Sequence, residues 1–298
     1  MERDRGSSDA EKEVPLLMKV CILDVSYLCH RARYSTGGLA FGGIPVGVTF
    51  GVLREIHKLL DLFAPTHWVF AFDAGGTGKR GEVYGDYKAH RKKEDRTPEE
   101  MEELKAFYQQ VKDLYHKHLP ACGFKNIIKA RGYEADDLIA RACEQLHSQR
   151  DEGYIISADE DLYQLLRGHI SQYLPKNGKI ITSEAFRKEY GIRPEQWPNV
   201  KAMAGCSSDN IKGIPGVGEK TAVKFLREQL NPSSKKYESI LDNMKIHNVN
   251  LPLVSLPYNG TPEVTIRDDE FSLKKMRDVE SSLGIKSARP RKKRNGFF

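Results

Sequence analysis

The stretch Lys-Val-Cys-Ile-Leu-Asp, residues 19–24, is a short apolar run that ends on a carboxylate. It predicts a buried β-strand, because such a run between polar flanks is typical of a strand that is covered on both faces. Residues 66–73 and 154–159 have the same form and end on Asp73 and Asp159. Three predicted strands therefore each end on an aspartate.

Helical patterns alternate with these strands. Apolar spacing predicts a helix over residues 46–63, and Pro98 opens a second helix whose first turns are rich in glutamate. A third helix covers residues 134–149, after a short strand at 126–129. Strands that alternate with helices predict an α/β fold with a parallel, buried sheet. Because the functional groups of such sheets gather beyond the carboxyl ends of the strands, we expect the three aspartates to lie together.

A second, helical unit follows residue 180. Residues 183–190, 194–204 and 219–230 predict helices, and a glycine-rich turn precedes the last of them. The remaining chain is irregular except for a predicted strand at 264–266 and a predicted helix at 273–283. The chain thus divides into a sheet-containing part and a helical part.

Further carboxylates lie near the predicted strand ends. The run Glu-Ala-Asp-Asp at residues 134–137 begins a helix, Asp161 follows the third strand, and Asp209 lies in a loop. Like charges about 4 Å apart repel by about 1 kcal/mol in water and by about 4 kcal/mol at an effective dielectric of 20. Hard divalent cations remove that cost, and two such ions can activate water for phosphodiester hydrolysis. Any one of these acids fits an ordinary surface or capping role, but the set together indicates a metal site.

The composition restricts the class of protein. Net charge is +6, and six basic residues with no acid lie between Lys286 and Arg294, so the rest of the chain is formally neutral. If metal ions neutralise the carboxylates of the predicted site, the remaining surface is net positive and suits a polyanionic partner. Mean hydropathy is −0.55, and no apolar run is long enough for a membrane span. Five cysteines without metal-ligand spacing predict reduced thiols in a cytoplasmic protein.

Six short motifs occur in the order found in one family. They are Ile-Leu-Asp24, Ala-Phe-Asp73, Tyr-Lys88-Ala-His-Arg91, Glu134-Ala-Asp136-Asp137, Ser-Ala-Asp159-Glu-Asp161 and Ser-Asp209-Asn. From about residue 19 to about residue 230, the chain resembles the bacterial and phage 5′ nucleases, which include the nuclease domain of bacterial DNA polymerase I and the flap endonucleases. The resemblance implies a PIN-like (Rossmann-like) α/β core, a helical arch and a helix–hairpin–helix DNA-binding unit. It also implies removal of 5′ flaps or RNA primers with two divalent metal ions.

The resemblance implies two groups of metal ligands. The family usually has Gly-Asp-x-x-Asp-Asn where this chain has Gly-Cys-Ser-Ser-Asp-Asn, so Cys206 replaces a carboxylate. Because a thiol is a poor ligand for Mg²⁺, we expect the second site to be weaker, and we expect Mn²⁺ to substitute for Mg²⁺. Asp24, Asp73, Glu134 and Asp136 would serve the first Mg²⁺ ion, and Asp137, Asp159, Asp161 and Asp209 would lean toward the second.

Two segments are expected to contact nucleic acid. In the basic segment 79–96, Lys88 and Arg91 would face the scissile phosphate as catalytic cations, and Tyr87 would stack on a base. Lys92 would also bind nucleic acid, although a solvated charged loop has the same composition. The stretch 213–222 resembles a helix–hairpin–helix turn, whose glycines admit a phosphate to a helix N-terminus, and a simple helix connection is the alternative. The expected contacts in this stretch are Gly213, Gly216, Gly218, Lys220, Thr221 and Lys224.

The expected organisation has four parts. The basic tail is open to three interpretations: solvated disorder, a nonspecific nucleic-acid arm, or a terminal Phe pair that docks on a sliding clamp. The parts are a flexible N-terminal segment (1–18), a PIN-like nuclease core (19–182) with an arch at about 79–118, a helical DNA-binding subdomain with C-terminal elements (183–284), and the basic flexible tail (285–298).

These features predict a monomeric, structure-selective 5′ nuclease of replication or repair with no membrane partner. Expected substrates are DNA with a 5′ end or flap and RNA–DNA primer junctions. Replication proteins are expected partners, at the nucleoid or at a phage replication site. Two alternatives stay open. A noncatalytic branched-DNA binder follows if the Cys206 change silences the second site, and a PIN-type ribonuclease is the other alternative, although the helix–hairpin–helix turn argues against it.

Overall fold

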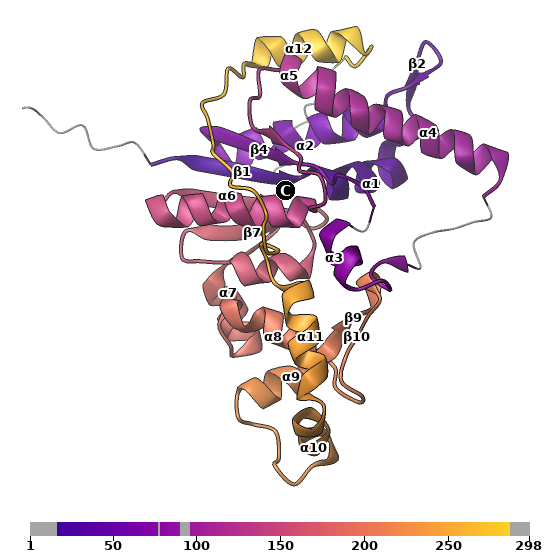
Figure 1. Cartoon of the computed structure of the whole chain (residues 1–298). Coiled ribbons are helices and arrows are strands. Elements are labelled where there is room, and N and C mark those ends of the chain that lie inside the picture. The colour runs from indigo at the N-terminus through magenta and orange to yellow at the C-terminus, as the bar shows by residue number, and fades with distance from the viewer. Residues whose placement is uncertain (1–16, 77, 90–95, 287–298) are drawn as a thin grey trace, which may run out of the picture.

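The computed structural model describes residues 17–76, 78–89 and 96–286. Its centre is a six-stranded sheet in the order β5-β4-β1-β6-β7-β8 (Figure 1). All neighbouring pairs are parallel except β7 and β8, so the predicted parallel core is confirmed. The strands are β1 (Lys19–Asp24), β4 (His67–Ala71), β5 (Ile127–Ile128), β6 (Glu152–Ile156), β7 (Ile170–Leu174) and β8 (Lys179–Ile181).

Helices cover both faces of this sheet. Cys21 and Leu23 of β1 belong to the core on one face, and Val20 and Ile22 belong to the core on the other. Because successive side chains of a strand point to opposite faces, burial of both faces explains why β1 has no polar face. The first face packs against α1 (Val25–Thr36), α2 (Gly47–Phe63), α4 (Pro98–Asp113) and α12 (Leu273–Ser282), and the second face packs against α6 (Ala135–Gln149).

The segment between β4 and α6 carries the predicted helix that begins at Pro98. Thr97 caps this helix, because its side chain accepts a hydrogen bond from the Glu100 N–H while the Glu100 carboxylate accepts one from the Thr97 N–H. Three short elements flank α4. They are α3 (Gly78–Val83) before it, and a π-helical segment (Leu114–His118) and α5 (Leu119–Ala121) after it. Earlier in the chain, a hairpin of β2 (Ala40–Phe41) and β3 (Ile44–Pro45) joins α1 to α2.

The second unit is helical and has a core of its own, which includes Phe186, Trp197 and Ile214. It lies below the sheet in Figure 1. A small hairpin of β9 (Gly205–Cys206) and β10 (Ile211–Lys212) interrupts it. The helices are α7 (Ser183–Tyr190), α8 (Trp197–Ala204), α9 (Glu219–Leu226), α10 (Lys235–Asp242) and α11 (Met244–Val254), with 3-10 turns at Glu160–Leu165, Pro194–Gln196 and Ser207–Asp209.

The predicted strand at 264–266 is wrong. Residues 255–272 contain no strand and return from α11 past the sheet to α12, as the orange-to-yellow trace of Figure 1 shows. Side chains of the core bind the backbone of this segment. Asn126 donates to the Arg267 carbonyl and accepts from the Arg267 N–H (both 2.8 Å), and Gln145 Oε1 accepts from the Ile266 N–H (2.9 Å). Because side chains satisfy these backbone groups, the segment needs no strand partner.

All five cysteines are free and buried, which agrees with the predicted absence of disulfides.

Within the described ranges, none of the helices combines the length and the apolar character that crossing a bilayer requires.

Candidate metal centre and nucleic-acid interface

The carboxyl ends of three neighbouring strands form an acidic edge of the sheet. β1 ends on Asp24, whereas β4 and β6 end shortly before Asp73 and Asp159. Asp24 is only 6% exposed and caps α1. The Tyr27 N–H donates to Asp24 Oδ1 (2.9 Å) and Ser157 Oγ donates to Asp24 Oδ2 (3.0 Å). The sheet therefore places the three aspartates at one edge, with Asp24 fixed by its neighbours.

The carboxylates of this edge repel one another. Burial raises the pKa of Asp24 to about 7, and the charge of Asp73 adds to that rise. Burial also raises the pKa of Asp136 well above its ordinary value, with contributions from Asp159, Asp24 and Asp73. The four carboxylates therefore lie close enough to act on one another, although Asp24 alone is buried, Asp136 is half-buried, and Asp73 and Asp159 are exposed. An all-oxygen donor set of that charge fits a hard divalent cation.

The N-terminus of α6 closes this acidic edge. The Ala135 N–H donates to Asp73 Oδ1 (2.8 Å), and Glu134 is the N-cap residue. The unpaired N–H groups and the dipole of a helix N-terminus favour carboxylates at this position. The helix end thus joins Asp73 to the acidic run that follows it.

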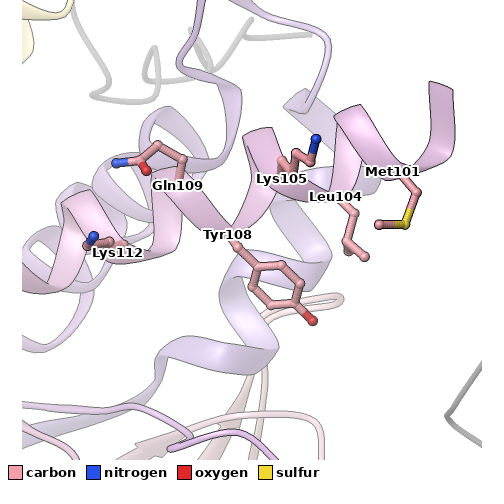
Figure 2. A pocket seen from close by; sticks show the side chains of 6 residues that line it. All are labelled: Met101, Leu104, Lys105, Tyr108, Gln109 and Lys112. Atoms are coloured by element: carbon pink, nitrogen blue, oxygen red, sulfur yellow. The ribbon is translucent and has the colours of Figure 1, made fainter. Parts of the chain in front are cut away.

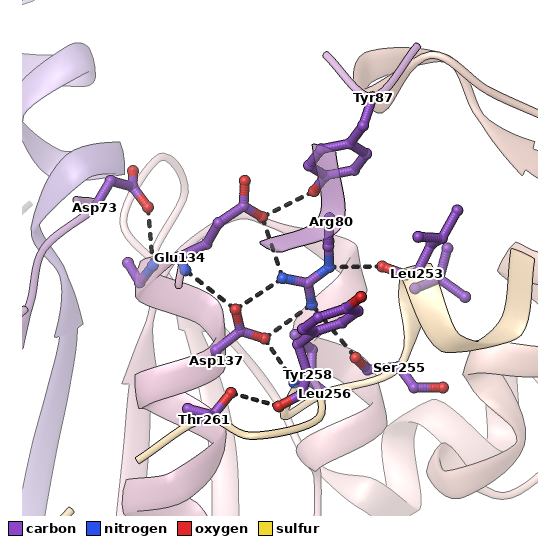
Figure 3. A network of polar contacts seen from close by, with 12 residues as sticks. Asp73, Arg80, Tyr87, Glu134, Asp137, Leu253, Ser255, Leu256, Tyr258 and Thr261 are labelled. Atoms are coloured by element: carbon purple, nitrogen blue, oxygen red, sulfur yellow. Dashed lines mark hydrogen bonds and ion pairs between the residues drawn. The ribbon is translucent and has the colours of Figure 1, made fainter. Parts of the chain in front are cut away.

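Asp137 does not fit the predicted role of a metal ligand. It is fully buried, and Arg80 binds it through two hydrogen bonds, Nη1 to Oδ2 (2.7 Å) and Nη2 to Oδ1 (2.8 Å) (Figure 3). The N–H groups of Glu134 and Tyr258 donate to the same carboxylate (3.1 and 2.8 Å). Four donors occupy the four lone-pair positions of a carboxylate. Asp137 is therefore a structural ion-pair residue, and we remove it from the proposed ligands.

Three side chains hold the Glu134 carboxylate. Tyr87 O–H donates to Glu134 Oε2 (2.8 Å), Lys88 Nζ lies 2.5 Å from Oε1, and Arg80 Nη1 lies 3.6 Å from Oε2. The Tyr87 ring is 1% exposed, so the prediction that it stacks on a base is wrong. Figure 3 shows its hydroxyl pointing at Glu134. Tyr87 acts on the site by orienting a carboxylate.

Lys88 lies between the two predicted ligand groups. Its φ of 54° is in the left-handed region, which few residues with a side chain adopt. Its N–H donates to the Asp209 carbonyl (2.9 Å), and its Nζ lies 3.6 Å from Asp209 Oδ1 as well as near Glu134. The other two predicted cations of this segment, Arg91 and Lys92, lie outside the described residues.

A second group of ligand atoms lies beside Asp159. One atom each from Asp161, Cys206 and Asp209 lie within 4.8 Å of one another. Burial raises the pKa of Asp161 to about 6, with a contribution from Asp159, and burial raises the pKa of the Cys206 thiol to about 11. The Asp161 N–H donates to Asp159 Oδ1 (2.8 Å), which connects the second group to the strand-end carboxylates.

Sequence reasoning missed two cations of this region. Arg80 was included in a basic segment expected to face nucleic acid, but it is buried against Asp137. Lys201 is 9% exposed, and its Nζ lies 3.1 Å from both Asp161 Oδ1 and Glu219 Oε1. Burial alone would lower the pKa of Lys201, but these two carboxylates raise it above its ordinary value. A single lysine inside an apolar helical stretch gives no signal of such a partner.

The glycine-rich turn before α9 has the form of a helix connection with an open N-terminus. A Cβ on Gly216 or Gly218 would meet nothing within 4 Å, and Gly216 has a φ of 73°. Gly213 differs, because a Cβ there would lie 2.2 Å from the Ala204 backbone, so this glycine serves packing. Thr221 is also buried, at 9% exposure. The packing thus explains why residue 213 is a glycine, whereas the nucleic-acid contacts of Gly213 and Thr221 remain predictions.

Two predicted lysines of this unit remain at the surface. Lys220 and Lys224 are exposed on α9, next to the turn that Gly216 and Gly218 form. They present positive charge beside a helix N-terminus, which is an arrangement suited to a phosphate.

A shallow hollow lies elsewhere, on the exposed face of α4. Figure 2 shows that Met101, Leu104 and Tyr108 line one side of it, with lysines on the other. No acidic residue lines this hollow, so it is separate from the metal centre.

Comparison with known proteins gives two consecutive family matches. Residues 19–191 match the model described as 5′-3′ exonuclease, N-terminal resolvase-like domain, and residues 192–251 match the model described as 5′-3′ exonuclease, C-terminal SAM fold. Together with the solved structures below, these matches confirm the predicted fold class, a PIN-like α/β core followed by a helical subdomain.

Two curated relatives illustrate the similarity. DNA polymerase I of Bacillus caldotenax is 36% identical over 215 residues, which is 70% of this chain and 23% of that protein. A 5′-3′ exonuclease of Aquifex aeolicus is 32% identical over 225 residues, which is 75% of this chain and 71% of that protein. The chain thus spans about a quarter of the length of the polymerase I relatives it matches.

Two solved structures share the fold. The T5 5′-exonuclease, determined with bound zinc, has a TM-score of 0.69 at 24% identity and aligns over 80% of this chain and 90% of its own. Flap endonuclease-1 from Methanococcus jannaschii has a TM-score of 0.52 at 15% identity, over 90% of this chain and 93% of its own. The likeness extends across both the sheet and the helical unit.

Proposed function

Since the chain belongs to the 5′-3′ exonuclease family, we propose that it is a structure-selective 5′ nuclease that hydrolyses phosphodiesters of DNA in replication or repair. The observation that carries this proposal is the gathering of Asp24, Asp73, Asp136 and Asp159 beyond the strand ends. Their burial and mutual repulsion favour a divalent cation, whose remaining coordination positions can accept the phosphate oxygens of a polyanion.

The donor set of this centre fits Mg²⁺, with Mn²⁺ as a substitute. Asp24, Asp73, Asp136 and Asp159 would hold this ion together with Glu134, and Asp161 and Asp209 would contribute to the site of a second divalent cation. When bound, a pair of such ions supplies Lewis acidity to the phosphate and an activated water. The ligand oxygens come from three different strand ends and one helix end, so the sheet itself fixes their spacing.

The chain's own cation at this centre is Lys88. Its ammonium group lies between Glu134 and Asp209, where it is positioned to bind a non-bridging phosphate oxygen and to stabilise the charge that develops there. Tyr87 and Arg80 contact the other oxygen of Glu134 and fix the orientation of this carboxylate. Arg91, which lies outside the described residues, is proposed to assist Lys88.

The helical unit would bind the duplex part of the substrate. The turn at Gly216 and Gly218 leaves the N-terminus of α9 open, and Lys220 and Lys224 add positive charge. Contacts of this kind reach the phosphate backbone and do not depend on base sequence. We propose DNA with a 5′ end or flap as the substrate, with RNA–DNA primer junctions as a further one, and a monomer acting with replication proteins in the cytoplasm.

The test is cleavage of a 5′-flap duplex labelled at its 5′ end, with products resolved by length. We expect cleavage in Mg²⁺ or Mn²⁺ and none in EDTA. The cleavage rate of Asp136→Asn should be at least about 100-fold lower, because this variant loses one charged ligand of the proposed metal ion. DNA binding should persist in the variant, because the α9 contacts remain. DNA binding without cleavage in the wild-type protein would contradict the proposed nuclease activity and would indicate a noncatalytic branched-DNA-binding protein. Preference for single-stranded RNA would indicate a ribonuclease.

A further inference from the structure

The group of Asp161, Cys206 and Asp209 differs from the strand-end carboxylates in its donor atoms. One ligand atom of each residue lies within 4.8 Å of the others, and these atoms are two oxygens and one sulfur. Mg²⁺ takes oxygen ligands, whereas Zn²⁺ and Co²⁺ accept a mixed set with sulfur. The two groups therefore do not suit the same ion.

The charged side chains around this group also favour a cation that binds sulfur. Lys201 Nζ lies 3.1 Å from Asp161 Oδ1, and Lys88 Nζ lies 3.6 Å from Asp209 Oδ1. Each lysine also contacts a second carboxylate, Glu219 for Lys201 and Glu134 for Lys88, so it offsets only part of the charge of Asp161 or Asp209. A neutral thiol adds no charge. A hard cation that leaves the thiol protonated has only the two carboxylates of this group as charged ligands, and it must give up part of its water shell to bind them. A cation that binds sulfur converts the thiol to a thiolate and so gains a third negatively charged ligand.

We propose that Asp161, Cys206 and Asp209 form a selective site for a thiophilic divalent cation, of which Zn²⁺ and Co²⁺ are the probes. This inference rests on the proposed function for the need of a second cation, while its sulfur ligand is a feature of this chain. On binding, the Cys206 S–H bond breaks, a sulfur–metal bond forms and the proton passes to the buffer. No electron is transferred.

The geometry allows the three ligands to close on one ion. Zn–S bonds of about 2.3 Å and Zn–O bonds of about 2.1 Å put neighbouring ligands roughly 3.4–3.6 Å apart in a tetrahedral site. The present separations, all within 4.8 Å, need only small side-chain shifts to reach that spacing. Cys206 is 6% exposed at the end of β9, with its sulfur 3.0 Å from Ser208 Oγ.

The other thiols do not compete for the ion. Cys21, Cys29, Cys122 and Cys143 are buried and have no pair of metal-ligand side chains beside them among the described residues. In the ranges that the structure describes, Asp161, Cys206 and Asp209 are the one group of three or more His, Cys, Asp or Glu residues whose ligand atoms all lie within 4.8 Å of one another. A metal–thiolate signal therefore reports on Cys206.

The test is a titration of the full chain with Co²⁺, without DNA, followed by displacement with Zn²⁺. Binding at Cys206 produces a near-ultraviolet thiolate-to-cobalt charge-transfer band, which cobalt held only by carboxylates does not produce. We expect the band in the wild-type protein and in Cys122→Ala, which removes a different buried thiol. We expect no band in Cys206→Ser or Cys206→Asp. Calorimetry in two buffers should show one proton released per Zn²⁺ at this site, and Cys206→Ser should bind Zn²⁺ at least about tenfold more weakly.

Two results would overturn the proposal. One is a wild-type protein without the charge-transfer band, and the other is a Zn²⁺ affinity that Cys206→Ser leaves unchanged. Neither depends on cleavage, so failure of this site is distinguishable from failure of the nuclease activity. Cys206→Asp completes the test: with three carboxylates at this position, the Mg²⁺ concentration for half-maximal binding should fall about tenfold.

Discussion

Lys88 combines an uncommon backbone conformation with a position between two acidic groups. A residue with φ near 54° carries a conformational cost of about 1–3 kcal/mol, which persists only where its surroundings hold it. Here the Asp209 carbonyl holds its N–H, and the Glu134 and Asp209 carboxylates hold its ammonium group. This backbone conformation thus places the Lys88 ammonium group near both Glu134 and Asp209.

Replacing Lys88 by Met should remove the cation and keep the length of the side chain. We expect kcat for flap cleavage to fall about 100- to 1,000-fold, because a charge that acts on the transition state is lost. The Kd for the DNA should change little, since the α9 lysines remain. Lys88→Arg is the matched variant and should retain part of the activity. A Lys88→Met protein with wild-type kcat would remove Lys88 from the centre.

The aspartates at the strand ends were predictable from the sequence, and Asp137 was not. Parallel strands meet at one edge, so Asp24, Asp73 and Asp159 follow from the order of apolar runs alone. Neighbouring helix residues differ by about 100° in direction, so the run at 134–137 spreads its acids over different faces. The direction of Asp137 depends on Arg80, which is distant in sequence, and no local pattern reveals that partner.

At the scale of elements, Arg80 joins three segments. Its side chain extends from α3 to Asp137 on α6, and its Nε donates to the Leu253 carbonyl at the end of α11 (2.8 Å) (Figure 3). A buried ion pair of this kind leaves an uncompensated charge when one partner is removed. The contacts of Arg80 therefore contribute to the stability of the fold as well as to the position of Glu134.

Arg80→Met should lower the free energy of unfolding by about 3–5 kcal/mol, because Asp137 remains buried without its partner. Asp137→Asn removes the charge and keeps an acceptor, so the double variant should lose clearly less than the sum of the single variants. Chemical denaturation of the four proteins measures this cycle. Additive losses would show that the two side chains do not depend on each other.

The exposed lysines of α9 give a prediction about binding. Replacing Lys220 and Lys224 together by Ala should weaken DNA binding equally for different sequences. The slope of log K against log salt should fall by about 2, since each phosphate contact contributes about 0.9. Lys274→Ala with Arg277→Ala is the control, because both are exposed on α12, which lies far from α9 in Figure 1. An unchanged salt slope in the α9 variant would exclude this helix from the interface.

The helices were more predictable than the chain that joins them. The helix at 98–113 follows from its proline and its capping residues, which are local. The segment at 264–266 has apolar residues at strand spacing, yet its hydrogen bonds go to Asn126 and Gln145. Those partners lie more than a hundred residues away, so a local pattern of strand type was misleading.

At the scale of the whole molecule, the chain after residue 254 completes the core although the family matches end at residue 251. Met276 and Val279 of α12 are 0% and 7% exposed in the core that β1 shares. Glu280 Oε1 and His57 Nε2 of α2 share a buried hydrogen bond (2.6 Å). The C-terminal segment is thus part of the fold of the nuclease core.

Ending the chain after Val254 should therefore destabilise the sheet-containing part itself. Burial of Met276, Val279 and Ile285 contributes about 1.5–3 kcal/mol per side chain, which together approaches the entire stability of an ordinary domain. Removal of the segment also deprives the buried His57 of Glu280 and the buried Asn126 of two of its hydrogen bonds. We expect a large fall in Tm by circular dichroism, or aggregation. A chain that ends after Lys286 keeps every described contact and should retain the Tm of the full chain. Equal Tm values for all three chains would mean that α12 only rests on the core without stabilising it.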